Sequence, residues 1–183
     1  MRRSTTEDTE AVRRARDGDP EAYEVLVARY TAPAHRLAYF LGAGDDAEDV
    51  VQEAFVKAYR ALSRYREDAP FRPWLLRIVA NETRNAVRGR KRRERLALRV
   101  LDVRTPDEPY LQAADTDRRR ALLAGVRALA GKDREVIVCR YFLELSEAET
   151  ATALSLPVGT VKSRTSRALA RLRARLDMEV LDA

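Results

Sequence analysis

The chain has 183 residues, with 35 Lys or Arg against 29 Asp or Glu, a formal net charge of +6 and a pI near 9.8, a balance that favours a polyanionic partner such as nucleic acid. One Cys and one His exclude a Cys/His zinc site within one chain, and a Ser-His-Asp triad would depend on His35, which we interpret as structural. No stretch reaches the roughly 18 uninterrupted apolar residues of a membrane span and no secretory leader is visible, so we expect a cytoplasmic protein.

The first strong helix signal follows a polar segment, residues 1–9, which we expect to be frayed. The helix starts at Asp19-Pro20-Glu21, since Asp suits the cap, Pro the first helical position and Glu the positive end of the helix dipole. Pro33 is expected to kink the helix, and Gly42-Ala43-Gly44 to end it. Its apolar stripe is assigned to the core: Ala22, Val25, Leu26, Tyr30, Leu37 and Leu41.

A second helix is expected to be capped by Asp45 or Asp46. Its outward face carries acids, an amide and one aliphatic residue, which is equally consistent with a solvated face and with a protein-binding surface. That face consists of Asp49, Gln52, Glu53, Val56 and Arg60. The inward side has a near-ideal helical period and is expected to be buried: Ala47, Val50, Val51, Ala54, Phe55, Ala58, Tyr59 and Leu62.

A loop is expected at residues 67–70, and Phe71-Arg72-Pro73-Trp74 leads into a third helix. One side is apolar, and the other carries arginines and amides that run on into the basic segment 90–93. Such a surface suits backbone phosphates and unstacked bases, and a solvated charged helix is the alternative. The polar side consists of Arg77, Asn81, Arg84, Asn85 and Arg88.

The helical period lapses after about Arg99, and residues 103–110 contain two prolines and several acids, which is typical of a linker. The helical signal returns near Asp117. The apolar residues after this point are expected to pack together, including Cys139 as a small buried hydrophobe. They are Leu122, Leu123, Val126, Leu129, Val136, Ile137, Cys139 and Tyr141.

The segment from Ser146 to Arg164 predicts two helices joined by a tight turn. Ser146 and Glu149 have the spacing of a capping box, and Pro157 blocks continuation of the first helix. The second helix has a buried stripe of Val161, Ala168, Leu169, Leu172 and Leu176. Its opposite face fits the major groove of DNA, with a basic surface helix as the alternative: Thr160, Lys162, Ser163, Arg164, Ser166, Arg167 and Arg171.

These patterns predict an all-α protein of two small helical domains, residues 10–95 and 118–178, joined by a flexible acidic linker at 96–117. Three motifs occur in order: residues 45–55 (DDAEDVVQEAF), residues 71–81 (FRPWLLRIVAN) and residues 157–164 (PVGTVKSR). Together they resemble the extracytoplasmic-function sigma factors of the sigma-70 family. The first domain is then similar to sigma region 2 and the second to the helix-turn-helix of region 4.

The resemblance implies a promoter-specificity subunit that docks on the β′ clamp helices of core RNA polymerase, and it implies no catalysis, cofactor or metal. Polymerase binding would fall to Asp49, Gln52, Glu53, Val56 and Arg60. Recognition and melting of the −10 element would fall to Phe71, Trp74, Arg77, Asn81, Arg84, Asn85 and Arg88. Contacts to the −35 element would fall to Thr160, Lys162, Ser163, Arg164, Arg167 and Arg171.

The chain departs from the family pattern at Thr150, where a buried aliphatic residue is usual, and at Ser155, where a turn glycine is common. The resemblance also implies an anti-sigma factor as a further partner. A free-standing helix-turn-helix regulator that binds its operator without polymerase is the alternative function. An enzyme acting on nucleic acid would need a carboxylate or metal cluster that the sequence does not provide.

Overall fold

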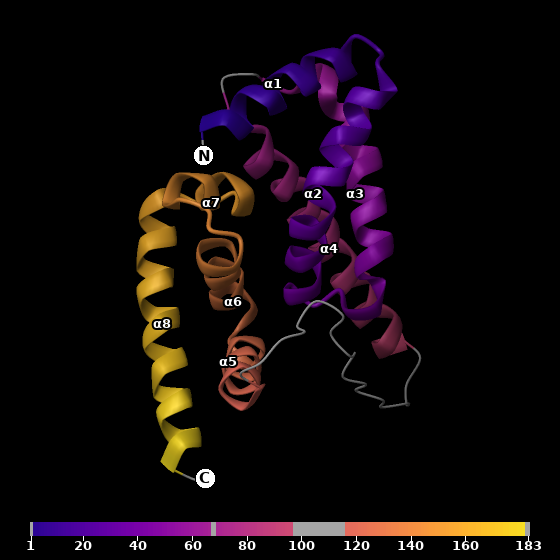
Figure 1. Ribbon diagram of the computed structural model, residues 1–183. Helices are drawn as coiled ribbons and strands as arrows, with labels where there is room; N and C mark the ends of the chain where they lie inside the picture. Colours follow the sequence, from indigo (N-terminus) through magenta and orange to yellow (C-terminus); the bar gives the residue numbers. More distant parts are fainter. Residues whose placement is uncertain (1, 67–68, 97–115, 182–183) are drawn as a thin grey trace.

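A computed structural model describes residues 2–66, 69–96 and 116–181, all within helices or the turns between them (Figure 1). The N-terminal half contains α1 (Arg2–Arg16), α2 (Pro20–Phe40), α3 (Ala47–Ala61) and α4 (Phe71–Leu96), with short 3-10 turns at Gly44–Asp46 and Leu62–Arg64. The C-terminal half contains α5 (Thr116–Ala128), α6 (Gly131–Ile137), the π-helical turn η3 (Val138–Phe142), α7 (Glu147–Leu154) and α8 (Val158–Leu181). The all-α prediction is confirmed, whereas most of the expected linker lies outside the described residues.

Helix α1 replaces the frayed segment expected at residues 1–9. Its anchor is Asp8, which is only 6% exposed and accepts hydrogen bonds from the Arg29 guanidinium and the Tyr30 hydroxyl. A buried carboxylate is stable only when it is paired and hydrogen-bonded, and both partners lie on α2. The prediction of a frayed end was wrong because the anchoring residue is an acid, which a search for apolar periodicity overlooks.

The start of α2 is confirmed, since the Asp19 carboxylate accepts hydrogen bonds from the backbone N–H groups of Glu21 and Ala22 at 3.0 and 3.2 Å. Most of the expected stripe is buried, but Val25 is 49% exposed and its assignment to the core was wrong. Helix α2 continues through Pro33 to Phe40.

Helices α3 and α4 pack closely on each other and on α2. Asp46 occupies the N-cap position of α3, but its side chain makes no capping bond and instead accepts from Arg90 at 3.2 Å. Arg90 also donates to the backbone carbonyls of Gly42 and Ala43, at 2.6 and 2.8 Å. Arg90 therefore ties α4 to the loop that precedes α3, although the sequence placed it in a basic DNA-binding segment.

The turn between α7 and α8 forms as predicted. The Ser146 hydroxyl accepts from the Glu149 backbone N–H at 3.2 Å, and the Glu149 carboxylate accepts from the Ser146 backbone N–H at 2.8 Å, which completes the capping box. Ser155 ends α7 in the left-handed conformation with φ of 55°. On α8, Val161, Ala168 and Leu172 form the buried stripe.

The apolar set predicted for α5 to η3 is buried only in part. Cys139 is fully buried as expected, and burial raises the pKa of its thiol to about 12. Leu122 and Tyr141 are 39% and 53% exposed, so their assignment to the core was wrong.

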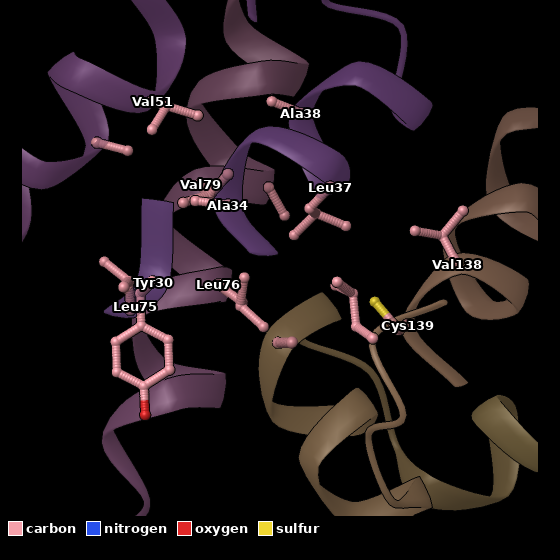
Figure 2. Close-up of a cluster of buried hydrophobic side chains, with 14 of the residues drawn as sticks. Tyr30, Ala34, Leu37, Ala38, Val51, Leu75, Leu76, Val79, Val138 and Cys139 are labelled. Carbon is pink, nitrogen blue, oxygen red and sulfur yellow. The ribbon is translucent and has the colours of Figure 1, made fainter. Parts of the chain in front are cut away.

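Most buried hydrophobic residues of both halves belong to one hydrophobic cluster. Figure 2 shows Leu37 of α2 and Leu76 of α4 in the same close-up as Val138 and Cys139 of η3. Helix α7 also packs on α4. The C-terminal half is therefore joined to the N-terminal half at the helix that carries the first predicted DNA-binding face.

Candidate nucleic-acid interface

An aromatic group lies at the start of α4. Trp74 is partly buried, with its ring centroid 5.0 Å from that of Tyr65 and 5.4 Å from that of Phe71. Phe71 also lies 5.7 Å from Tyr30 and is 2% exposed. The predicted contact between Phe71 and DNA therefore needs correction, because in this structure the Phe71 ring is part of the core and packs against Trp74.

The polar face of α4 forms as the spacing predicted. Arg77, Asn81, Asn85 and Arg88 are exposed, and Arg84 is half-buried between them. The Arg88 guanidinium donates to the Asn85 side-chain oxygen at 2.7 Å, and Arg84 donates to that of Asn81 at 3.1 Å. These bonds join residues three apart, which lie on one side of a helix. Arg84 also binds Glu135 of α6.

The second basic face lies at the N-terminal end of α8. Lys162, Ser163 and Arg167 are exposed, and Thr160 and Arg164 are partly exposed. The Lys162 ammonium lies 3.5 Å from the Glu147 carboxylate at the start of α7. Because both side chains are exposed to solvent, this ion pair contributes little to stability.

Arg171 lies further along α8 and differs from the other five residues predicted to contact the −35 element. It forms an ion pair with Asp133, whose side chain is only 10% exposed. This pair holds α8 to α6, so Arg171 has a structural role that the sequence did not indicate.

The outward face of α3 is exposed at every predicted position. Asp49, Gln52, Glu53 and Arg60 surround Val56, which is 43% exposed, in a mixed polar and apolar surface. The Glu53 carboxylate lies 3.3 Å from the Lys57 ammonium, which also binds Glu82 of α4 at 2.6 Å.

Tyr59 is the residue of this surface that the sequence reading missed. It was expected in the core but is 45% exposed, and its ring lies 4.9 Å from that of Tyr23 on α2. The Tyr23 hydroxyl donates to the Phe55 carbonyl at 2.6 Å, which fixes the ring that supports Tyr59. Tyr59 follows Val56 by three residues, and this spacing is the signal that could have placed it on the outward face.

Within residues 6–66, 69–93 and 120–176, no group of three or more His, Cys, Asp or Glu side chains is placed to hold a metal ion. No helix in the described part of the chain has the length and apolar content to cross a membrane.

Comparison with known proteins identifies the family of the chain. Residues 26–93 match the family model of sigma-70 region 2, and residues 119–172 match that of sigma-70 region 4. The RNA polymerase sigma-H factor of Pseudomonas aeruginosa is 33% identical over 177 residues, 88% of this chain and 90% of that protein. The chain belongs to the extracytoplasmic-function branch of the sigma-70 family. It is an RNA polymerase sigma factor and directs transcription initiation.

Solved structures agree with this assignment over most of the sigma factor. The CnrH factor of Cupriavidus metallidurans, solved in complex with the cytosolic domain of CnrY, is 31% identical, with a TM-score of 0.70 over 94% of this chain and 98% of that chain. The sigma factor RpoE of Bartonella quintana, solved with the anti-sigma factor NepR, is 25% identical, with a TM-score of 0.68 over 85% of this chain and 96% of that chain.

Proposed function

We propose that this sigma factor docks on core RNA polymerase through the outward face of α3 and reads promoter DNA through α4 and α8. One observation carries the proposal: a single chain presents a mixed apolar and acidic helix face together with two separate basic helix faces. A protein that only coats DNA needs no such acidic face. A protein that reads one operator needs only one basic helix.

The α3 surface has the composition of a protein interface. Val56 and Tyr59 supply exposed apolar area at its centre, and Asp49, Gln52 and Glu53 supply a polar rim. Interfaces commonly have an apolar centre with a polar edge, and aromatic residues often carry much of the binding energy. A clamp helix of the polymerase β′ subunit is the partner that family membership suggests.

A matched pair of valines tests this docking. Val56→Asp places a charge in the apolar centre, so we expect affinity for core polymerase to fall by about tenfold or more, equivalent to about 1.4 kcal/mol. Val25→Asp is the control, because Val25 is similarly exposed, at 49% against 43%, but lies on α2. Co-elution and titration with core enzyme would measure both. Equal losses in the two variants would contradict a specific role for α3.

The α4 face is suited to a separated DNA strand. Exposed arginines and amides can bind phosphates and base edges, and the ring of Trp74 offers a surface on which a base can stack. Extruding a base from the duplex costs a few kcal/mol, which contacts to the unstacked base must offset. We therefore assign Trp74, Arg77, Asn81, Arg84, Asn85 and Arg88 to the −10 element, with Phe71 as support beneath Trp74.

Helix α8 is assigned to duplex DNA. Its N-terminal turns carry Thr160, Lys162, Ser163, Arg164 and Arg167 on the face opposite the buried stripe, which is the placement that a recognition helix uses in the major groove. If Arg164 binds a guanine through two hydrogen bonds, Arg164→Ala should cost about 1–3 kcal/mol and relax selectivity at one base pair. A uniform loss across all sequences would instead assign Arg164 to a phosphate.

Family membership argues against a free-standing regulator, and the two functions differ in a simple experiment. A sigma factor should bind its promoter tightly only with core polymerase, whereas a free-standing regulator should shift the same DNA alone.

We further propose that the protein acts without catalysis and without a cofactor. We place it in the cytoplasm, where core polymerase works, with an anti-sigma factor as its regulator, since CnrH and RpoE were each solved with a protein partner.

A further inference from the structure

Three buried aromatic rings form a group behind Trp74. The centroids of the Tyr65 and Phe71 rings lie 5.0 and 5.4 Å from that of Trp74, and the Tyr30 ring lies 5.7 Å from Phe71. Tyr65, Phe71 and Tyr30 are 7%, 2% and 4% exposed, whereas Trp74 is only partly buried. The indole is therefore the one ring of the group with a face towards solvent. We call Tyr30, Tyr65 and Phe71 the aromatic support.

The hydroxyl of Tyr65 fixes one side of the aromatic support. It donates a hydrogen bond to the backbone carbonyl of Ala69, whose own N–H donates to the carbonyl of Arg66 at 3.3 Å. Ala69 lies two residues before α4 begins at Phe71. The Tyr65 side chain thus contacts Trp74 with its ring and binds the chain that leads into α4 with its hydroxyl.

The hydroxyl of Tyr30 fixes the other side, through α1. It donates to the carboxylate of Asp8, which is 6% exposed and also accepts from Arg29. Figure 2 shows this hydroxyl pointing away from the other labelled side chains of the core. Helix α1 precedes residues 26–93, the part of the chain that matches sigma region 2. A helix outside that match is therefore connected to Trp74 through the rings of Tyr30 and Phe71.

The two hydroxyls are not required to fill the core. A phenylalanine would occupy nearly the same space as either tyrosine, and a buried hydroxyl is costly unless it is hydrogen-bonded. What a hydroxyl adds is direction, because a hydrogen bond is favourable only over a narrow range of distances and angles. An indole held in one orientation before a base arrives loses less conformational entropy when the base stacks on it.

We propose that the hydroxyls of Tyr30 and Tyr65 hold the Trp74 ring in the orientation that stacks on an unpaired base of the −10 element. Asp8 takes part as well, because it is the acceptor that fixes the Tyr30 hydroxyl. All three are positioning residues, since they act on DNA only through Trp74. Helix α1 is thereby part of the −10 site. The proposal rests on the assignment of Trp74 to the −10 element.

The first part of the test observes the indole in the free protein. Trp74 is the only tryptophan of the chain, so tryptophan fluorescence reports on this ring alone. Tyr30→Phe and Tyr65→Phe each remove one hydroxyl and keep the ring. In both variants we expect faster and wider motion of the indole by time-resolved anisotropy, and stronger quenching by acrylamide.

Tyr39→Phe is the matched control. It makes the same chemical change on α2, but the Tyr39 hydroxyl accepts from Arg127 at 2.5 Å and the ring packs on Phe40. Its indole motion should match that of wild type. Urea unfolding would verify that the three variants are folded. Equal indole motion in all three variants would overturn the proposal.

The second part measures promoter melting by the holoenzyme. A promoter with 2-aminopurine in the −10 element brightens when the base unstacks. The rate of brightening should fall about threefold or more in Tyr30→Phe and Tyr65→Phe, as expected for the loss of one hydrogen bond, and not in Tyr39→Phe. Co-elution with core polymerase should be unchanged, because docking is assigned to α3. Wild-type melting by both Tyr30→Phe and Tyr65→Phe would overturn the proposal.

The role of α1 has its own measurement. Asp8→Ala should slow melting, and adding Tyr30→Phe to it should cause no further loss, because the hydroxyl has then already lost its acceptor. Fully additive losses would overturn the link through Asp8. If Trp74→Ala melted the promoter as fast as wild type, the assignment of Trp74 to the −10 element would fail. The anisotropy of the free protein would still decide whether the hydroxyls hold the ring.

Discussion

Thr150 lies in the interior of α7 with a hydroxyl that the fold does not use. The residue is 0% exposed, and its Oγ1 finds no hydrogen-bond partner among the residues that the structure describes. A threonine in a helix often donates to the carbonyl four residues earlier, as Thr152 does to Ala148 at 3.1 Å. At Thr150 that carbonyl, on Ser146, accepts the backbone N–H at 2.8 Å, and no bond from the hydroxyl accompanies it. The resemblance to the family implied an aliphatic residue at this position.

Thr150→Val should therefore stabilise the protein. An unsatisfied buried hydroxyl costs about 1–3 kcal/mol, and the added methyl group contributes apolar burial of up to about 0.8 kcal/mol. Allowing for partial relaxation around the hydroxyl, we expect a gain of about 1–2 kcal/mol in the free energy of unfolding. For a chain of this size that corresponds to a rise of about 2–8 °C in Tm.

Urea unfolding followed by circular dichroism would measure this gain, since the dichroism reports on the helices of both halves. Thr152→Val is the matched control: it makes the same chemical change two residues away but removes an existing hydrogen bond. It should be neutral or destabilising. The reasoning would be refuted if Thr150→Val were no more stable than wild type, or if the two variants gained equally.

Three further outcomes are expected. Ser155→Gly should raise stability by about 0.5–1 kcal/mol in urea unfolding, because the left-handed conformation at φ 55° costs a serine more than a glycine. Arg90→Ala should lower stability by about 2 kcal/mol or more, since it leaves backbone carbonyls and Asp46 without their donor, whereas Arg92→Ala, at an exposed position, should be nearly neutral. Burial raises the pKa of the Cys139 thiol from 9.0 to about 12, so the thiol should react with iodoacetamide only as fast as the protein unfolds. Its contribution to the free energy of unfolding is complete below pH 9 and is lost as the pH rises towards 12. Rapid alkylation of the folded protein at pH 8 would contradict this.

Local sequence signals predicted local structure well. The Asp19 cap, the capping box at Ser146 and Glu149, and the buried stripe of α8 depend on residues within one or two turns of each other, so their spacing determines their geometry. Periodicity was less reliable at the edges of each stripe. Val25 and Tyr59 are about half exposed because the neighbouring helices cover them only in part. A pattern of apolar residues does not contain the position of a neighbouring helix.

Long-range polar contacts were beyond the sequence. Asp8 is separated from its partner Arg29 by 21 positions and Arg84 from Glu135 by 51, and no spacing rule relates residues so far apart. Arg171 and Arg90 show the same limit within the predicted DNA-binding segments. Their charge suggested phosphate contacts, but the fold uses them to bind Asp133 and the loop before α3. For an arginine, composition and exposure predict a surface position, and only the fold reveals which acceptor it binds.

The distribution of these arginines bears on how the sigma factor would find its promoter. The two proposed DNA faces differ in this structure, because Arg84 of α4 is bound to Glu135 whereas Lys162 and Arg167 of α8 are exposed. Helix α8 by itself offers duplex DNA few phosphate contacts, so its affinity for free DNA is expected to be weak and salt-sensitive. Docking on polymerase would hold both faces against one promoter so that their contacts add, and we therefore expect tight promoter binding only in the assembly.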